Sequence, residues 1–132
     1  MKTRYNVHAL TLLAGVTAVG TLTGSAFGQE APKHAPPAYV ADPAVYKLLG
    51  ENDQFLVIMA KKPAGNRDAW HSHLPLTAYN LTDCHQRIYT PDGKSSEVTY
   101  KAGTVIFHGA VPSHSVENIG TAECDQLIVE RK

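Results

Sequence analysis

The chain has 132 residues, with 12 basic and 12 acidic side chains and a formal net charge of +0 at pH 7. A chain of this length is enough for one domain and not two. It has no basic stripe and no amphipathic basic helix, which argues against a nucleic acid or an anionic membrane as its partner.

The first 28 residues have the pattern of a secretory signal peptide. A short basic start at residues 1–4 precedes an uncharged apolar run at residues 8–23, and small residues follow up to Gly28. We expect cleavage after Gly28 or after Ala26, and a periplasmic or secreted mature protein. The alternative is a retained membrane anchor, but the apolar run is short for a span and is interrupted by glycines and threonines.

Cleavage after Gly28 leaves residues 29–132, with 10 basic and 12 acidic side chains. Residues 29–41 contain three prolines and predict a mobile linker before the domain at residues 42–132. No other segment is apolar for long enough to cross a bilayer, so we expect no membrane contact after cleavage.

The domain begins with a segment that has the start and stop signals of a short helix, residues 42–49. Asp42 suits the N-cap, Pro43 the first helical position, and Gly50 the position after the end. Three apolar residues between them form one edge, which would pack against a sheet.

The rest of the domain has the pattern of short strands separated by turns. The predicted strands are residues 55–60, 69–73, 76–83, 87–90, 96–101, 104–108, 114–118 and 124–130. Between two of them, Pro-Asp-Gly-Lys at residues 91–94 predicts a hairpin turn. So many short strands and so little helix predict an all-β fold, a small antiparallel sandwich or barrel.

Two histidines, His71 and His73, lie at positions i and i+2 of one predicted strand. Their side chains therefore project from the same face. A third, His114, follows Pro112 at the start of another strand and would complete a set of three imidazoles. Neutral imidazole is the commonest metal ligand near physiological pH, so the pattern predicts a metal site. The alternative is a chance His-x-His, because the chain has seven histidines.

The two cysteines, Cys84 and Cys124, both lie in the predicted mature chain. An exported chain meets an oxidising compartment, where a disulfide between them is one alternative. Two separate buried thiols are the other, and the sequence does not distinguish them. Neither cysteine has a second one at Cys-x-x-Cys spacing, so they do not predict a metal site.

The first histidine segment resembles the first motif of the cupin superfamily. That motif runs Gly, five residues, His-x-His, three or four residues, and Glu. Gly65, His71 and His73 match it here, whereas the two positions allowed for the Glu hold Thr77 and Ala78.

The second histidine segment resembles the second cupin motif, which runs Gly, five residues, Pro-x-Gly, two residues, His, three residues, and Asn. Gly103, His114 and Asn118 match, while Gly109 and Val111 replace the Pro and the inner Gly. The resemblance covers residues 55–132 and implies an all-β jelly-roll barrel, or double-stranded β-helix, preceded here by one short N-terminal helix. It also implies that a homodimer would not be unusual.

The resemblance implies that His71, His73 and His114 hold one divalent transition metal, with open positions for water or substrate. Without the glutamate, the site would prefer iron, copper, nickel or zinc over manganese or magnesium. A metal held by neutral ligands also keeps more positive charge, which favours an anionic substrate or hydroxide.

Four further residues are candidates for the pocket: His108, Tyr79, Tyr100 and Thr77. His108 would be a fourth ligand or an acid/base at the mouth, or simply a residue at a strand end. The tyrosines would offer hydroxyls to a ligand, or would be ordinary sheet aromatics.

The sequence supports two hypotheses of function. The first is a metalloenzyme, a dioxygenase or a zinc-type Lewis acid, that acts on a small oxygen-rich metabolite. The second is a non-catalytic domain that binds or senses a small molecule without metal. No carboxylate near the motifs is an evident acid or base, which favours the second hypothesis slightly. The fold alone does not distinguish the two.

Overall fold

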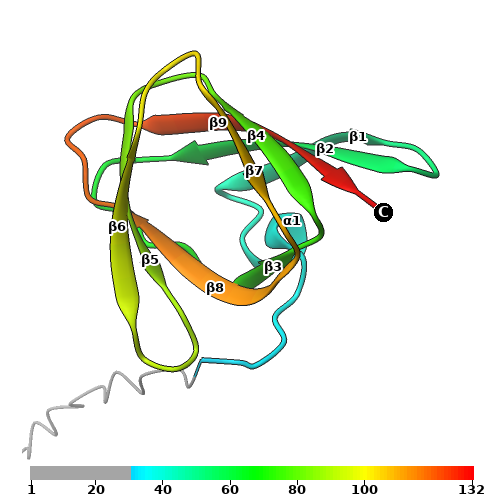
Figure 1. Cartoon of the computed structure of the whole chain (residues 1–132), viewed down its shortest axis with the longest axis horizontal. Coiled ribbons are helices and arrows are strands. Elements are labelled where there is room, and N and C mark those ends of the chain that lie inside the picture. Colours follow the sequence, from blue (N-terminus) through cyan, green and yellow to red (C-terminus); the bar gives the residue numbers. More distant parts are fainter. Residues whose placement is uncertain (1–30) are drawn as a thin grey trace, which may run out of the picture.

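One short helix and nine strands make up residues 31–132, the part of the chain that the structure, a computed structural model, describes (Figure 1). The elements are α1 (Ala38–Ala41), β1 (Tyr46–Glu51), β2 (Phe55–Lys62), β3 (His71–His73), β4 (Leu76–Asn80), β5 (Cys84–Tyr89), β6 (Ser95–Tyr100), β7 (Val105–His108), β8 (Val111–Asn118) and β9 (Cys124–Arg131). No helix in this part is long and apolar enough to span a membrane. The signal peptide predicted for residues 1–28 lies outside the described residues.

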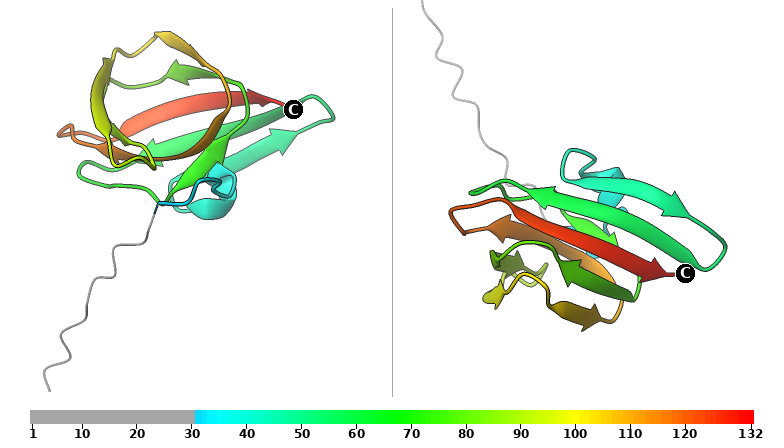
Figure 2. Two further views of the ribbon diagram at one scale, coloured as in Figure 1. Left: turned by 60° about the horizontal axis from the view of Figure 1, so that its bottom comes forward. Right: turned by 90° about the horizontal axis from the view of Figure 1, so that it is seen from above.

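The strands form two antiparallel sheets that curve around a common interior (Figures 1 and 2). The larger has the order β1-β2-β9-β4-β7, and the smaller has the order β3-β8-β5-β6. Sequential neighbours such as β5 and β6 are hairpins, whereas β9 pairs with both β2 and β4 and so lies at the centre of its sheet. The predicted all-β, double-sheet fold is confirmed.

The core lies between the two sheets because the strands alternate inward and outward residues. In β2, Leu56, Ile58 and Ala60 are buried, and Ala78 of β4 and Ile128 of β9 meet them from neighbouring strands. This period of two is what the pleat of a strand imposes on a sheet with one buried face.

The helix predicted over residues 42–49 is wrong. The helix lies earlier, and Asp42 is its C-cap rather than the N-cap of a new one. After one turn, in which the Tyr46 N–H donates to the Asp42 carbonyl at 2.9 Å, the chain enters β1 and pairs with β2. A six-residue antiparallel partnership outweighs local capping preferences, which amount to about 1 kcal/mol each.

The predicted linker also differs, because its last residues pack on the barrel. The Ala35 N–H donates to the Pro112 carbonyl at 3.0 Å, and the Ser72 N–H donates to the Pro36 carbonyl at 2.8 Å. Ala38 is fully buried in the core. Proline fixes an extended backbone that can still accept hydrogen bonds, so this segment lines the edge of β3 instead of leaving the surface.

Cys84 and Cys124 form a disulfide, with an S–S distance of 2.04 Å, which is one of the two alternatives that the sequence left open. The bridge joins β5 of the smaller sheet to β9 of the larger one. It therefore ties the two sheets together covalently at one end of the interior.

Candidate metal centre

His71, His73 and His114, the histidine cluster, meet inside the barrel. One ring nitrogen from each lies within 4.8 Å of those of the other two, and the ring centroids are 4.4 to 5.2 Å apart. His71 pairs with His114, but His73 pairs with Val111, so β8 has one extra residue between these two pairs. This bulge keeps inward-facing residues of both strands on the same side, and bulges often lie beside functional sites.

Hydrogen bonds orient two of the rings. His71 Nδ1 lies 2.8 Å from the Ala69 carbonyl oxygen, and His73 Nδ1 lies 2.5 Å from Glu130 Oε1. Both partners are acceptors, so each Nδ1 carries the proton and each Nε2 presents a lone pair. Within the described part of the chain, the buried Nε2 atoms of His71 and His114 have no hydrogen-bond partner. Orphaned buried nitrogens that face one another fit a metal ion.

Burial also keeps His71 and His114 uncharged. It lowers the pKa of His71 to about 4, although the nearby Asp68 carboxylate opposes this shift. Burial, together with the neighbouring histidines, lowers the pKa of His114 to about 2. At neutral pH both rings are therefore in the neutral form that binds metals.

Glu130 supplies the carboxylate that the first motif lacks, but at a different place. It comes from β9, its side chain is buried, and Oε1 accepts the proton of His73 Nδ1 on the side of the ring away from Nε2. A carboxylate in this position fixes the ring and raises its basicity without binding the metal itself. The cupin motifs do not point to Glu130, although alternation along β9 places it on the same face as Gln126 and Ile128.

A buried polar group lies next to His71 and consists of Tyr46, Lys62 and Asp68. Lys62 Nζ lies 2.7 Å from Asp68 Oδ2, and the Tyr46 hydroxyl donates to the same oxygen at 2.7 Å. Lys62 Nζ also donates to the Tyr46 oxygen at 3.3 Å. The Tyr46 ring centroid is 4.8 Å from that of His71.

Burial shifts the two titratable side chains of this group that line the interior. It raises the pKa of Tyr46 well above its usual value, with Asp68 adding to the effect. It lowers the pKa of Lys62, while the Asp68 carboxylate opposes the shift by favouring the ammonium. Neither side chain is predicted from the sequence, because Tyr46 lies in the helix wrongly predicted over residues 42–49 and Lys62 lies beyond the predicted end of its strand at residue 60. Continued alternation from Ala60 would have placed Lys62 inside.

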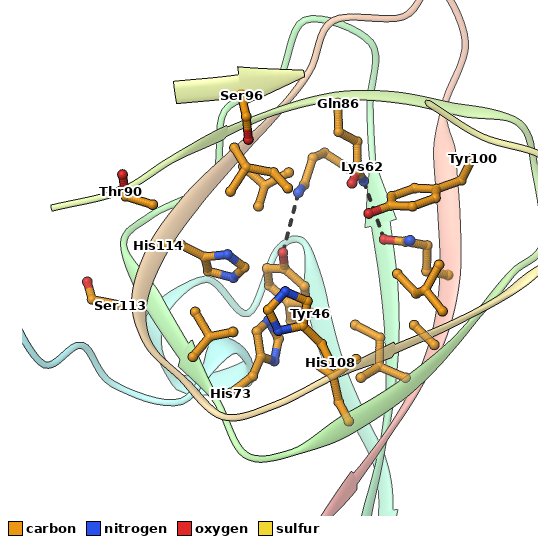
Figure 3. Close-up of a pocket in the computed structure, with 18 residues that line it drawn as sticks. Tyr46, Lys62, His73, Gln86, Thr90, Ser96, Tyr100, His108, Ser113 and His114 are labelled. Carbon is orange, nitrogen blue, oxygen red and sulfur yellow. Dashed lines mark hydrogen bonds between the residues drawn. The ribbon is translucent and has the colours of Figure 1, made fainter. Parts of the chain in front are cut away.

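The histidine cluster opens onto a cavity of about 270 Å³ (Figure 3). His73 and His114 form part of its wall together with Tyr46 and Lys62. Its apolar lining residues are Leu76, Ala78, Ile88, Ile106, Val111, Val116 and Ile128.

Two of the four additional pocket candidates lie on this cavity and two do not. His108 and Tyr100 line it, and both side chains point into it in Figure 3. Thr77 and Tyr79 lie on the outer face of β4, where they pair with residues of β7, and Tyr79 is 42% exposed. Thr77 is therefore not a residue of this cavity, and Tyr79 is the ordinary sheet aromatic that the sequence left as the alternative. The reason is that Ala78, between them, is buried, and adjacent strand residues point to opposite faces.

Solved cupin structures share this architecture. A cupin domain protein from Bordetella pertussis superposes with a TM-score of 0.61 and 21% identity, over 74% of this chain and 96% of that one. A cupin family protein with a double-stranded β-helix fold from Methanocaldococcus jannaschii gives a TM-score of 0.54 and 14% identity, over 66% and 78%. A cupin superfamily protein from Desulfitobacterium hafniense gives 0.50 and 10%, over 66% and 75%.

The comparisons in sequence add nothing to this likeness, since no protein-family model and no curated protein matches the chain. At such low identity the structural likeness concerns the fold alone. The chain has the double-stranded β-helix fold of the cupin superfamily.

Proposed function

We propose that this protein is a small exported metal-binding cupin in which His71, His73 and His114 hold one divalent transition metal. The observation that carries the proposal is the convergence of one ring nitrogen from each of the three histidines within 4.8 Å of the others. In addition, the buried Nε2 atoms of His71 and His114 have no hydrogen-bond partner among residues 31–132. Leaving such atoms unsatisfied in a folded interior costs about 1–3 kcal/mol each, which a bound ion would offset.

The donor set narrows the metal to iron, copper, nickel or zinc. Three neutral nitrogens suit these ions, whereas magnesium and manganese prefer oxygen ligands. When bound, the ion would supply Lewis-acid or redox chemistry to a small molecule in the cavity. Glu130 would fix the orientation of the His73 ring by accepting the proton of His73 Nδ1, and the apolar wall would keep bulk water away from the site.

The metalloenzyme that we propose is a dioxygenase or another enzyme acting on a small oxygen-rich metabolite. One observation favours the second candidate, a non-catalytic domain that binds or senses a small molecule. The cavity lining, taken from residues 31–132, includes no carboxylate, so the acid/base groups on the wall are histidine, tyrosine and lysine side chains. Oxygen consumption by the metal-loaded protein, tested against panels of small metabolites, separates the two.

Export is part of the proposal and is supported by the disulfide. Structural disulfides persist in oxidising compartments such as the periplasm, and Cys84 and Cys124 are paired here. Fractionation of cells that express the full chain, with mass spectrometry of the mature start, tests this point. A protein retained in the reducing cytoplasm with residues 1–28 attached would contradict it.

The decisive measurement is the metal content of the mature protein, purified without a histidine tag. We expect about one equivalent of iron, copper, nickel or zinc, lost in the His71→Ala/His73→Ala double variant. His34→Ala/His85→Ala is the matched control, because it removes two histidines that lie outside the histidine cluster. Absence of metal after reconstitution with all four ions would contradict the proposed metal site and leave the metal-free binding domain.

A further inference from the structure

Lys62 is a buried cation in the wall of the cavity that His73 and His114 line. It is 3% exposed, yet it lines the same hollow as His73 and His114 (Figure 3). A lysine is rarely buried unless its charge is paired, and the Asp68 carboxylate at 2.7 Å provides that pairing. The ion pair keeps a positive head group on the wall of an otherwise largely apolar chamber.

The ammonium of Lys62 has one more donor than its neighbours use. It carries three N–H groups, and its acceptors within residues 31–132 are Asp68 Oδ2 and the Tyr46 oxygen. The third N–H is left for the cavity. The Tyr46 hydroxyl is not available as a competing donor, since it donates to Asp68 at 2.7 Å.

The charges around the cavity favour an anion. The histidine cluster brings no negative charge to a metal, Asp68 is paired with Lys62, and Glu130 is the remaining buried carboxylate next to the cluster. A divalent ion in the cluster would therefore leave the site with an excess of positive charge. A small ligand with one negative charge would balance it, and the apolar part of the wall would accommodate the rest of that ligand.

We propose that Lys62 is an anion-binding residue and that the ligand of this cavity is a small organic monoanion, a carboxylate on an apolar body. The carboxylate lies at the Lys62 end of the cavity, and the apolar body packs against residues such as Ile88, Ile106 and Ile128. The proposal deepens the proposed function by naming its ligand class. The excess of positive charge requires the metal, whereas the contact with Lys62 does not.

The test uses two pairs of probes that differ in charge and hardly in shape: benzoate with benzamide, and acetate with acetamide. Binding of each is measured by calorimetry at pH 7, on the metal-free and on the zinc-loaded mature protein. We expect benzoate to bind at least tenfold more tightly than benzamide to the zinc-loaded protein. The metal-free protein should show a smaller preference, which comes from the contact with Lys62 alone, and acetate should bind more weakly than benzoate. A benzoate-to-benzamide ratio below about two in the metal-free protein would overturn the proposal.

Lys62→Met retains the length of the side chain and removes the charge, so it should lose at least tenfold in benzoate affinity and leave benzamide unchanged. Lys61→Met is the matched control, because Lys61 is the adjacent residue in the chain, its side chain is 58% exposed, and it pairs with Asp125 at 3.3 Å. It should change neither affinity by more than about twofold. Retention of benzoate affinity in Lys62→Met would overturn the proposal.

If Lys62→Met does not fold, Lys62→Met/Asp68→Asn removes both partners of the ion pair and should show the same loss. If neither folds, the ratio of the two probes in the unsubstituted protein decides. Failure of the metal site is measured separately, as absence of zinc from a protein that still prefers benzoate. A protein that binds zinc but does not prefer benzoate to benzamide would contradict the role of Lys62 and leave the metal site supported.

Discussion

The two ends of the barrel interior both bury polar side chains, but they treat them differently. At one end, Asn80, Gln86 and Gln126 form an amide ladder, in which Gln126 donates to Asn80 at 2.7 Å and Gln86 donates to Gln126 at 3.3 Å. Asn80 in turn donates to Thr104 at 3.0 Å. At the other end, the buried Nε2 atoms of His71 and His114 have no partner in the part of the chain described.

This difference in hydrogen bonding distinguishes polar side chains that stabilise the fold from polar side chains that are available to bind a ligand. A buried polar network that satisfies itself fixes the register of the strands that contribute to it. A buried polar cluster that leaves lone pairs facing one another has a requirement that only an added atom can meet. Equal burial therefore has opposite meanings at the two ends, and substitutions should affect folding at the first and ligand binding at the second.

The largest effect on stability should come from the disulfide at the amide end. Replacing both Cys84 and Cys124 with Ser should lower the free energy of unfolding by roughly 3–4 kcal/mol, because the bridge closes a loop with a sequence separation of 40. Urea titration followed by circular dichroism measures the loss. The metal content of the folded variant should not change, and a parallel loss of metal would contradict the separation of the two ends.

Acid should destabilise the metal-free protein through the histidine end. The pKa of His71 is about 4 in the folded chain against an ordinary 6.5, so the unfolded chain takes up its proton first. The effect of His71 on the free energy of unfolding is absent above pH 6.5. As the pH drops to 4, it lowers the free energy of unfolding by roughly 3 kcal/mol. Denaturation midpoints at pH 7 and pH 4.5 should show this fall, and it should be smaller in His71→Gln. Equal midpoints would contradict the burial of a neutral ring.

Asn80→Ala should break the amide ladder and cost about 1–3 kcal/mol of stability, since it leaves Gln126 without its acceptor. Thermal unfolding measures the loss. Zinc affinity should stay within about twofold of the unsubstituted protein, because Asn80 does not contact the histidine cluster. A larger change in zinc affinity than in stability would show that the two ends are coupled.

Glu130→Gln should have the opposite effect to Asn80→Ala and lower the metal affinity more than the stability. The amide retains the shape of the side chain but is a weaker acceptor for His73 Nδ1–H, and such outer partners are worth 10- to 100-fold in metal affinity, or about 1.4–2.7 kcal/mol. Competition with a coloured chelator measures the affinity. Glu117→Gln, at a part-buried site outside the cluster, is the control. An unchanged affinity in Glu130→Gln would contradict its positioning role.

The smallest effect should come from the outer face. Tyr79→Phe removes a hydroxyl that lies outside the cavity and should change stability by less than about 0.5 kcal/mol, with no change in metal or benzoate binding. Tyr100→Phe removes a hydroxyl from the cavity wall and serves as the comparison. Benzoate binding that depends on Tyr79 more than on Tyr100 would contradict the orientation of β4.

The strands and the histidine cluster were predictable because both depend on local spacing. The pattern of short strands between turns predicted β2 and β9, and His-x-His with a later His114 predicted the three rings. Local spacing predicts the wrong element where pairing with another strand determines the structure, as for β1, which begins at Tyr46 inside the predicted helix. The sequence also does not establish which face of the strand at residues 76–83 points inward, so it does not exclude Thr77 and Tyr79 from the pocket.

The partners of the histidine cluster lay beyond what motif spacing can reach. Glu130 is 57 positions from His73 along the chain, and Asp68 accepts from Tyr46 across 22. Such pairings depend on which strands become neighbours in the sheet, and no motif encodes that. Alternation could name Glu130 and Lys62 as inward residues, but only the topology shows what they contact.

The position of β9 has a consequence for how the chain acquires its structure. Of the nine strands in residues 31–132, the last to be synthesised is β9, which lies in the middle of its sheet, between β2 and β4, and carries Cys124 and Glu130. Until it arrives, β2 and β4 lack their shared partner, the covalent tie is absent, and His73 has no carboxylate. The larger sheet is therefore completed only after β9 has been synthesised, and the export that we propose would use the interval before that.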